Sequence, residues 1–217
     1  MEIKCIEGTG FASNVYVIGE RVVVDTGLDA AETIAKLERV CKLEKIEVIV
    51  LTHRHCDHTG GAKKLQEVTG AEVLAHPQAA EILSIGNEST TGCHSFGVSL
   101  PPLEVHPLSE GRMNIGEGEW EVIYTPGHTI DSISLYHRET KALICGDTLF
   151  AHGGVGRWDL ATGDYHQLLQ SVSLLSGMEI ESIYPGHGPW VRGNAKKHIE
   201  NSLAYLRIFG RGGVAGE

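Results

Sequence analysis

The sequence has little of what marks secreted or membrane proteins. Its five cysteines are an odd number without paired spacing, which argues against a disulfide framework and for a reducing compartment. They are Cys5, Cys41, Cys56, Cys93 and Cys145. No apolar stretch approaches a membrane span, and the start at Met1 lacks the basic and apolar regions of a signal peptide. These absences predict a cytoplasmic protein with no membrane partner.

Positive charge is also scarce. The 18 Lys and Arg residues stand against 28 Asp and Glu, for a formal net charge of −10. Basic residues gather only in short clusters, at Lys63-Lys64, at Lys196-Lys197, and at Arg207 with Arg211. Because such a surface repels phosphate backbones, we expect no nucleic-acid partner. Bound divalent cations would cancel several of the negative charges.

The remaining bulk properties are those of an ordinary globular protein. The chain has 217 residues, of which 41% are hydrophobic and 21% charged. No repeat, linker or low-complexity tract interrupts it. We therefore expect a single domain spanning residues 1–217.

Strand and helix patterns alternate, but not in a simple βαβα rhythm. Residues 14–18 and 21–25 predict a β-hairpin, and residues 30–41 predict a helix capped by Asp29. Further strands are expected at 47–51, 73–75, 120–124, 132–136, 142–145 and 182–184. Further helices are expected in a stretch ending at Val68 and at 78–85, 165–175 and 194–208. Residues 86–102 fit neither pattern and predict a long loop of the kind that forms lids or binding loops.

A cluster of metal-ligand residue types follows the predicted strand 47–51. His53 and His55, two apart at an extended strand end, lie on one side of the chain, and Asp57 with His58 follows in the turn. Imidazole nitrogens and a carboxylate suit zinc, and they also suit iron or manganese. Any one of these histidines taken alone would more commonly be a surface or core residue. Together the four predict a metal site.

Three further candidates lie where predicted strands end. His128, Asp147 and His187 each directly follow a glycine. In α/β sheets ligands gather on the loops at one end of the strands, and glycine lets the backbone turn tightly beside a metal. Each signal is weak alone, because Gly-His pairs are common. Their agreement with the cluster predicts a shared site.

This set of motifs resembles the metallo-β-lactamase superfamily. The string His53-x-His55-x-Asp57-His58 is followed, in the superfamily's order, by Gly127-His128, Gly146-Asp147 and Gly186-His187. The resemblance runs from Asn14 through His187. It implies an α/β (α+β) fold, a four-layer αββα sandwich with metals in a groove at one edge. The strand and helix patterns alone are compatible with that fold but do not establish it.

Carried over residue by residue, the resemblance implies two adjacent divalent metal ions, expected to be zinc, with iron or manganese as alternatives. The implied ligands are His53, His55 and His128 for the first ion, Asp57, His58 and His187 for the second, and Asp147 bridging both. Cys56 stands at a variable position of the motif and is interpreted as a bystander. The other histidines are interpreted as surface or structural residues: His76, His94, His106, His137, His152, His166 and His198. Of these, His152 follows Asp147 closely.

The implied mechanism needs no protein nucleophile. Metal coordination lowers the pKa of water to roughly 7, so a metal-bridged hydroxide is available to attack an electrophilic carbonyl. Asp57 would orient the hydroxide or relay its proton, in addition to binding metal. The sequence has no Gly-x-Ser-x-Gly elbow that would indicate a serine nucleophile. A small-molecule substrate is expected.

Residues 147–150 and 154–157 resemble the glyoxalase II branch, whose members cleave acylated glutathione thioesters. Val155 stands where that branch usually has Cys. Only 30 residues follow His187, too few for the helical C-terminal domain with which glyoxalase II binds glutathione. We therefore expect a compact hydrolase of a small ester, thioester or lactone. Arg157 either meets a substrate carboxylate or forms a structural salt bridge.

An oxidoreductase is the alternative. Persulfide dioxygenases are similar in sequence and use one iron held by two His and one Asp, here His53, His128 and Asp147 by position. The region around His187 is more similar to the hydrolases. A nuclease is disfavoured by the charge, a β-lactamase by the missing export signal, and a non-enzymatic metal-binding module by the presence of every ligand. The C-terminal helix packs either on the core or on a second subunit, which leaves a homo-oligomer open.

Overall fold

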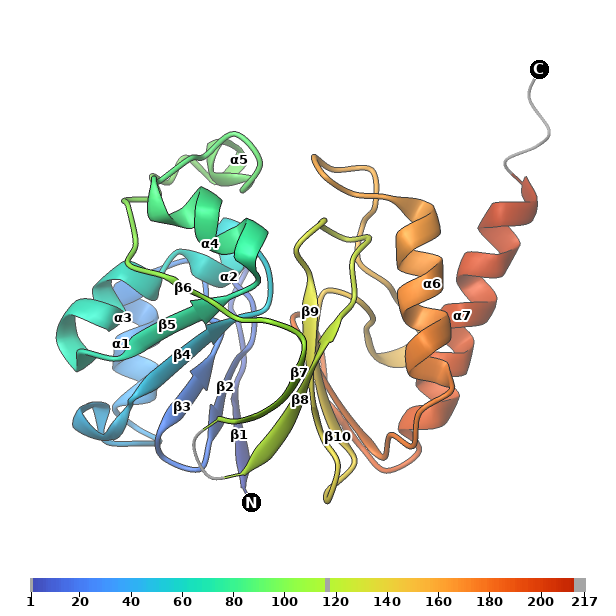
Figure 1. Ribbon diagram of the computed structural model, residues 1–217, viewed down its shortest axis with the longest axis horizontal. Coiled ribbons are helices and arrows are strands. Elements are labelled where there is room, and N and C mark those ends of the chain that lie inside the picture. The colour runs from blue at the N-terminus through green and yellow to red at the C-terminus, as the bar shows by residue number, and fades with distance from the viewer. Residues whose placement is uncertain (1, 116–117, 213–217) are drawn as a thin grey trace.

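Two β-sheets form the centre of the protein, and helices cover the outer face of each (Figure 1). The structure is a computed structural model that describes residues 2–115 and 118–212. Each sheet has six strands, and the layers run helix, sheet, sheet, helix. The expected four-layer αββα sandwich is confirmed.

The first sheet comes from the N-terminal half, in the order β1-β2-β3-β4-β5-β6. Its strands are β1 (Ile3–Ile6), β2 (Val15–Ile18), β3 (Val22–Val24), β4 (Val48–Leu51), β5 (Glu72–Ala75) and β6 (His106–Pro107). The predicted hairpin is confirmed, because β2 and β3 pair antiparallel, whereas β3 to β6 run parallel. The sequence patterns did not identify β1 and β6, which extend the sheet at its two edges.

Most helices of this half lie on the outer face of the first sheet, whereas the short helix Cys93–Phe96 lies beyond the ends of its strands, at the top of Figure 1. They are α1 (Ala30–Leu37), α2 (Cys56–Thr59), α3 (Ala62–Thr69), α4 (Pro77–Ser84) and α5 (Cys93–Phe96), with a 3₁₀ turn at Leu43–Lys45. The cap predicted for α1 is confirmed: Asp29 Oδ1 accepts a hydrogen bond of 2.8 Å from the Glu32 N–H. Residues 86–102 are irregular apart from α5, which the sequence patterns did not identify.

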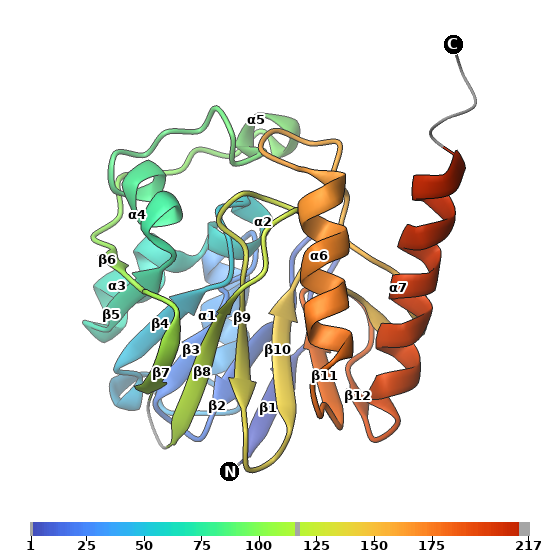
Figure 2. The same ribbon diagram turned by 45° about the vertical axis from the view of Figure 1, so that its right-hand side comes forward.

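The second sheet comes from the C-terminal half, in the order β12-β11-β10-β9-β8-β7. Its strands are β7 (Gly111–Asn114), β8 (Glu119–Tyr124), β9 (Ile133–His137), β10 (Ala142–Gly146), β11 (Ser182–Pro185) and β12 (Val191–Arg192). Only β10 and β11 pair in parallel. A 3₁₀ turn lies at Ala151–Gly153. Helices α6 (Tyr165–Ser176) and α7 (Ala195–Gly212) lie side by side on its outer face (Figure 2).

The strands carry apolar side chains on both faces because each sheet is covered twice. In β4, Ile49 and Leu51 face the helices, whereas Val50 faces the second sheet. The uninterrupted apolar run of this strand therefore fills two cores at once. Burying each such side chain stabilises the fold by about 1.5–3 kcal/mol. The ligand motif that follows β4 therefore starts from a strand that is packed on both faces.

Helix α7 packs against the second sheet and α6 through Ile199, Leu203 and Leu206. Of the two placements left open for this helix, the structure shows packing on the core. Within residues 2–115 and 118–212, no helix is long and apolar enough to cross a membrane.

Candidate metal centre

All seven predicted ligands lie together where strands of both sheets end. His53, His55, Asp57 and His58 follow β4 of the first sheet, and His128, Asp147 and His187 follow β8, β10 and β11 of the second. Their donor atoms fall into three overlapping groups, and within each group the atoms lie within 4.8 Å of one another. The chain brings them to one edge because every one of these strands ends on the same side of the sandwich.

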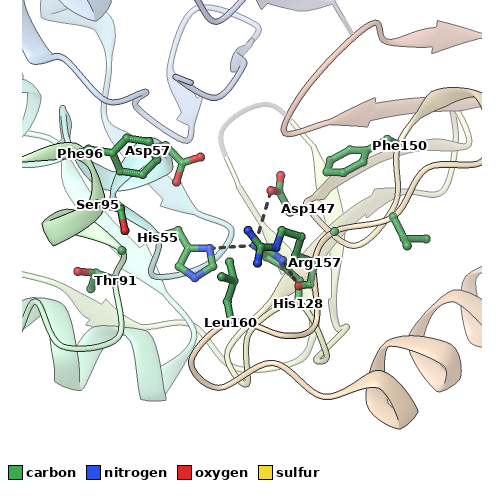
Figure 3. Close-up of a pocket in the computed structure, with 13 residues that line it drawn as sticks. His55, Asp57, Thr91, Ser95, Phe96, His128, Asp147, Phe150, Arg157 and Leu160 are labelled. Atoms are coloured by element: carbon green, nitrogen blue, oxygen red, sulfur yellow. Dashed lines mark hydrogen bonds and ion pairs between the residues drawn. The ribbon is translucent and has the colours of Figure 1, made fainter. Parts of the chain in front are cut away.

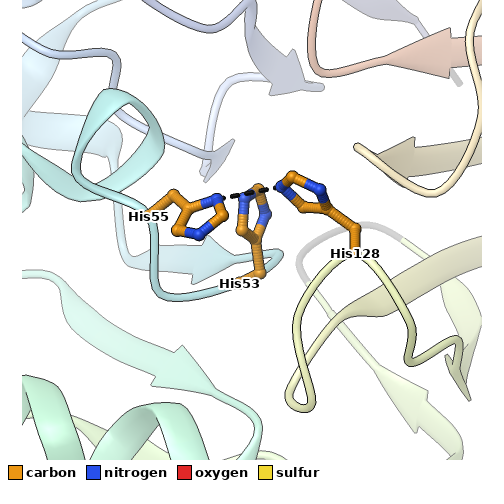
Figure 4. A group of neighbouring side chains, drawn as sticks. All are labelled: His53, His55 and His128. Atoms are coloured by element: carbon orange, nitrogen blue, oxygen red, sulfur yellow. Dashed lines mark hydrogen bonds between the residues drawn. The ribbon is translucent and has the colours of Figure 1, made fainter. Parts of the chain in front are cut away.

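Three histidines form the first group (Figure 4). His53 and His55 come from the turn after β4, and His128 reaches them from the opposite sheet. The Nδ1 of His55 lies 2.9 Å from the Nε2 of His128. All three side chains are buried. These are the residues that the resemblance assigns to the first ion.

Asp57, His58 and His187 form the second group. The Nε2 of His187 lies 3.1 Å from Asp57 Oδ2 and 3.3 Å from the Nε2 of His58. The His187 side chain is 31% exposed and is the most open of the three. The second ion of the resemblance would therefore lie nearer the solvent.

Asp147 lies between the two groups. Its Oδ1 is 3.2 Å from the Nε2 of His58. Its Oδ2 is 3.6 Å from the Nε2 of His128 and 3.5 Å from the Nε2 of His187. One carboxylate thus contacts donors of both groups, as a bridging ligand must.

Within the described residues, the buried Nε2 of His53 has no hydrogen-bond partner, and the buried Oδ1 of Asp147 is left with the 3.2 Å ion-pair contact to His58. A buried polar atom without a partner costs free energy. Several imidazole nitrogens also lie close together, with 2.9 Å between His55 Nδ1 and His128 Nε2 and 3.3 Å between the Nε2 atoms of His58 and His187. Nitrogen and oxygen donors of this kind coordinate divalent metals at about 2.0–2.2 Å. The residues therefore fit a dinuclear metal site.

Hydrogen bonds behind the ligands set the direction of their rings. The Nδ1 of His58 lies 2.8 Å from Asp25 Oδ2. Asp25 also accepts hydrogen bonds of 2.8 Å from the backbone N–H and the hydroxyl of Thr52. That hydroxyl lies 3.1 Å from the Nδ1 of His53. Both rings are thereby fixed with Nε2 toward the site, an arrangement typical of metal-binding histidines.

Asp25 is not among the residues that the sequence pattern indicated for the site. It is 1% exposed and has a left-handed backbone, with φ of 58°, a conformation that is uncommon outside glycine. A signal was present, because Asp25 ends the apolar run of β3 just as the ligands end theirs. Asp25 contacts the Nδ1 of His58, however, on the side of the ring that faces away from the other ligands. Spacing along the chain does not show that contact.

Arg157 supports the site through its backbone. The Nδ1 of His128 donates to the Arg157 carbonyl oxygen over 2.7 Å, which leaves Nε2 for a metal. Its guanidinium is exposed and pairs with Asp159 through bonds of 2.9 and 2.7 Å. Of the two roles that the sequence left open for Arg157, the salt bridge is therefore present. A contact with a substrate carboxylate stays a prediction.

Gly186 is required by the closeness of the ligands. A Cβ atom at this position would lie 2.1 Å from Asp147 Oδ1 and 2.5 Å from the Cε1 of His58. Both distances are far inside van der Waals contact. The prediction that glycine lets the backbone approach the site is confirmed here, and the reason is space rather than an unusual φ angle.

The protonation states differ between the two groups. Burial lowers the pKa of His55 to about 3 and the pKa of His53 and His128 below the ordinary range, so these imidazoles are neutral. Burial also acts to lower the pKa of His58, but the carboxylates of Asp147, Asp25 and Asp57 outweigh it and raise that pKa well above its usual value. The metal-free second group therefore carries a proton on His58.

The two carboxylates of the site are ionised. Burial acts to raise the pKa of both Asp57 and Asp147. The neighbouring charge of His58 is the larger of the opposing influences, and the pKa of each carboxyl falls below its ordinary range.

A cavity of about 320 Å³ opens onto the site (Figure 3). His55, Asp57, His128 and Asp147 form its floor. Residues of the 86–102 segment form one wall, and residues 150–160 the other. These wall residues are Thr91, Gly92, Ser95 and Phe96 on one side and Phe150, Val155, Gly156, Arg157 and Leu160 on the other. This position agrees with the prediction of a lid or binding loop at residues 86–102.

Two histidines outside the ligand set have structural contacts. His76 accepts a hydrogen bond from the Gln78 N–H at the start of α4, and its ring stacks on Tyr124 at 4.8 Å. The His152 ring packs against that of His198 at 5.1 Å. Neither His76 nor His152 belongs to a group of donor atoms near the site. This agrees with the interpretation of both as structural or surface residues.

The chain belongs to the metallo-β-lactamase superfamily, because the family model described as "Metallo-beta-lactamase superfamily" matches residues 8–187. A protein of Methanocaldococcus jannaschii named "Probable metallo-hydrolase" is 38% identical over 192 residues, which cover 84% of this chain and 91% of that protein. Hydroxyacylglutathione hydrolase GloC of Haemophilus influenzae is 30% identical over 200 residues, which cover 88% of this chain and 92% of GloC.

Solved structures agree with this assignment. The BLEG-1 B3 metallo-β-lactamase superposes with a TM-score of 0.78 and 28% identity, over 95% of this chain and 99% of that one. The protein TTHA1623, solved in a di-iron-bound form, superposes with a TM-score of 0.74 and 28% identity, over 93% and 96%. Family, fold and donor geometry together define an enzyme of the hydrolase type.

Proposed function

We propose that the protein is a two-metal hydrolase that cleaves a small thioester, ester or lactone, with acylated glutathione thioesters as the leading substrate class. One observation carries the proposal: seven donors form three overlapping groups, and Asp147 contacts histidines of the first and the last of them, beside an open cavity. The proposed ligands are His53, His55 and His128 for one ion, Asp57, His58 and His187 for the other, and Asp147 for both.

Divalent ions held by these residues supply a water of lowered pKa and a polarised carbonyl oxygen. Asp57 is proposed to accept and relay the proton of the attacking water. It lines the cavity, its side chain is 14% exposed, and its lowered pKa keeps it ionised at neutral pH. His187, 3.1 Å from Asp57 Oδ2, holds that carboxylate in place.

Thioesters come first among the proposed substrates because the chain is similar to the hydroxyacylglutathione hydrolase GloC. The short stretch of chain after His187 speaks against a glutathione thioester when the sequence is considered alone. Hydroxyacylglutathione hydrolase GloC is matched over 92% of its own length, so that name belongs to a chain of similar extent. Arg157 is the proposed contact for a substrate carboxylate, which its position on the cavity wall and its exposed guanidinium support. Phe96, Phe150 and Leu160 give the rest of the walls an apolar surface.

Zinc is the proposed metal, with iron or manganese as alternatives. A set of imidazoles and carboxylates without thiolates suits all three metals. The di-iron form of TTHA1623 shows that iron occupies such a site in a similar protein. Metal identity therefore needs a direct measurement.

The first experiment is to purify the protein without added metal and measure its metals by mass spectrometry. About two zinc ions per chain, together with hydrolysis of one class in a panel of glutathione thioesters, simple esters and lactones, would support the proposal. Two ions per chain with no hydrolysis of any of these classes would contradict the substrate assignment and leave the metal site intact.

The alternative is a persulfide dioxygenase with one iron held by His53, His128 and Asp147. The contact of 3.6 Å between the Nε2 of His128 and Asp147 Oδ2 is compatible with such a site. The second group, with Asp57, His58 and His187 at close range, would then have no metal ion to bind. One iron per chain and oxygen consumption with glutathione persulfide would replace the hydrolase proposal with this one.

We further propose that the protein acts on small molecules in the cytoplasm and not on nucleic acid. The net charge of −10 supports this, because it opposes the approach of a phosphate backbone.

A further inference from the structure

Arg54, the residue between His53 and His55, points away from the ligands and is buried. Its side chain is 5% exposed and forms an ion pair with Asp131, which is fully buried. The Arg54 Nε donates to Asp131 Oδ2 over 2.8 Å. A buried pair of this kind is costly to break, because the remaining charge is left without a partner.

Asp131 connects this pair to the turn that carries His128. Its other oxygen, Oδ1, accepts a hydrogen bond of 2.5 Å from the hydroxyl of Thr129. Thr129 in turn accepts a backbone hydrogen bond of 3.0 Å from Gly127. One guanidinium therefore joins the ligand motif after β4 to the turn after β8, across the two sheets.

The same guanidinium holds the wall of the cavity. Its terminal Nη1 donates to the Thr90 hydroxyl over 2.7 Å. The next residue, Thr91, is fully buried and lines the cavity. The Thr91 carbonyl accepts a hydrogen bond of 2.8 Å from the N–H of Cys56, the other non-ligand position of the motif. Both variable positions of the motif are thus used to dock the 86–102 segment.

The docked segment is closed on itself elsewhere. Glu88 Oε1 accepts from the Leu100 N–H over 2.7 Å, and the Glu88 carbonyl accepts from the Thr91 hydroxyl over 3.0 Å. Its outer end carries Phe96, whose ring packs on Phe11 at 5.6 Å. Within the described residues, Arg54 and Cys56 are its hydrogen-bonded links to the ligand motif.

We propose that Arg54, together with Asp131 and Thr90, is a positioning unit that sets the cavity wall 91–96 against the metal centre and thereby tunes which substrates fit. The effect on catalysis rests on the proposed hydrolase function; the docking of the wall does not. Arginine suits this role because its planar fork contacts two segments at once, whereas a lysine ammonium is a single point charge.

The test uses Thr90→Val, which removes one hydroxyl and leaves the ion pair intact, with Thr90→Ser as the matched control that keeps it. In metal-loaded protein, we expect hydrogen exchange in residues 86–102 to rise about tenfold in Thr90→Val, as the loss of a hydrogen bond to a charged group predicts. Thr90→Ser should stay close to the parent protein. Equal exchange in the two variants would overturn the proposal, whatever the activity.

Kinetics separate positioning from general damage. For the best thioester, KM of Thr90→Val should rise about three- to tenfold with kcat within about twofold, since the wall binds substrate and does not touch the reacting atoms. Metal content should be unchanged. Loss of metal in Thr90→Val would overturn the proposal, because the effect would then pass through the metal centre. If the parent protein hydrolyses no thioester, ester or lactone but the exchange result holds, the proposed function fails and the positioning unit stands.

Arg54→Lys extends the test to the arginine itself. Lysine keeps the charge beside Asp131 but cannot reach both partners, so we expect the exchange increase of Thr90→Val with metal still bound. Exchange in Arg54→Lys equal to that of the parent protein would contradict the role assigned to the fork. Because the Thr90 variants keep the buried pair, they remain informative if Arg54→Lys does not fold.

Discussion

The floor of the cavity and its wall of residues 150–160 are built in opposite ways. On the floor, His128 and Asp147 are buried, and the neighbouring His53 and His58 are held from behind by hydrogen bonds. On that wall, the guanidinium of Arg157 is paired with its exposed neighbour Asp159, and Leu160 is 38% exposed. The contrast shows that the ligands depend on a rigid frame, whereas residues of this wall can change without disturbing that frame.

The largest expected effect comes from filling space in the floor. In Gly186→Ala the new Cβ would overlap Asp147 and His58, so we expect at least about a hundredfold loss of metal affinity or activity, as when the support of a metal ligand is lost. The control is Gly188→Ala. Its Cβ would meet nothing within 4 Å, although its φ of 73° makes it unfavourable. This variant should lose about 1 kcal/mol of stability and keep its metal. Metal titration and thermal unfolding of both variants check the contrast.

A smaller effect is expected behind the floor. Asp25→Asn keeps the shape of the side chain but removes the charge that faces the Nδ1 of His58. Loss of such a partner typically costs 10–100-fold in metal affinity or activity. Competition with a chromophoric chelator measures the affinity. An unchanged affinity would show that the Asp25 contact shapes the backbone alone.

The two donor groups should also differ in proton release. His53, His55 and His128 are already neutral, whereas His58 carries a proton in the metal-free protein. We expect uptake of the second ion to release about one proton and to weaken as pH falls, because the proton competes with the metal. The metal-free fold should behave in the opposite way. The raised pKa of His58 stabilises it fully below about pH 6.5, and this contribution is lost as pH rises through the folded value. Calorimetry in buffers of different ionisation enthalpy counts the protons.

The smallest effect is expected on the wall. In Arg157→Gln the carbonyl that holds His128 remains, so metal content should not change. KM for a thioester with a carboxylate should rise about two- to fivefold, within the range of an exposed charge contact. A neutral ester should show no change. An equal effect on both substrates would argue against a contact with a substrate carboxylate.

The structure brings together the seven residues that the sequence singled out, whereas the sequence indicated little of the cavity walls, for physical reasons. Each ligand follows a buried strand. Strands β4 and β10 are recognisable in the sequence as uninterrupted apolar runs, because each packs into a core on both of its faces. Strands β6 and β7 were missed because His106–Pro107 is too short for a pattern and Gly111–Asn114 is mostly exposed and polar. The carbonyl of Arg157 was beyond reach, since any residue carries a carbonyl and only the folded chain aims it at a histidine.

The meeting of two sheets at the floor has a consequence for the lifetime of the protein in a cell. Each donor group takes residues from both halves of the chain, so a bound ion would fasten the halves together at their open edge. A ligand that binds only the folded state stabilises that state in proportion to the logarithm of its free concentration. A shortage of metal would then remove activity and would also raise the fraction of opened molecules that proteases can cut. The abundance of the protein in the cell would therefore follow the metal supply.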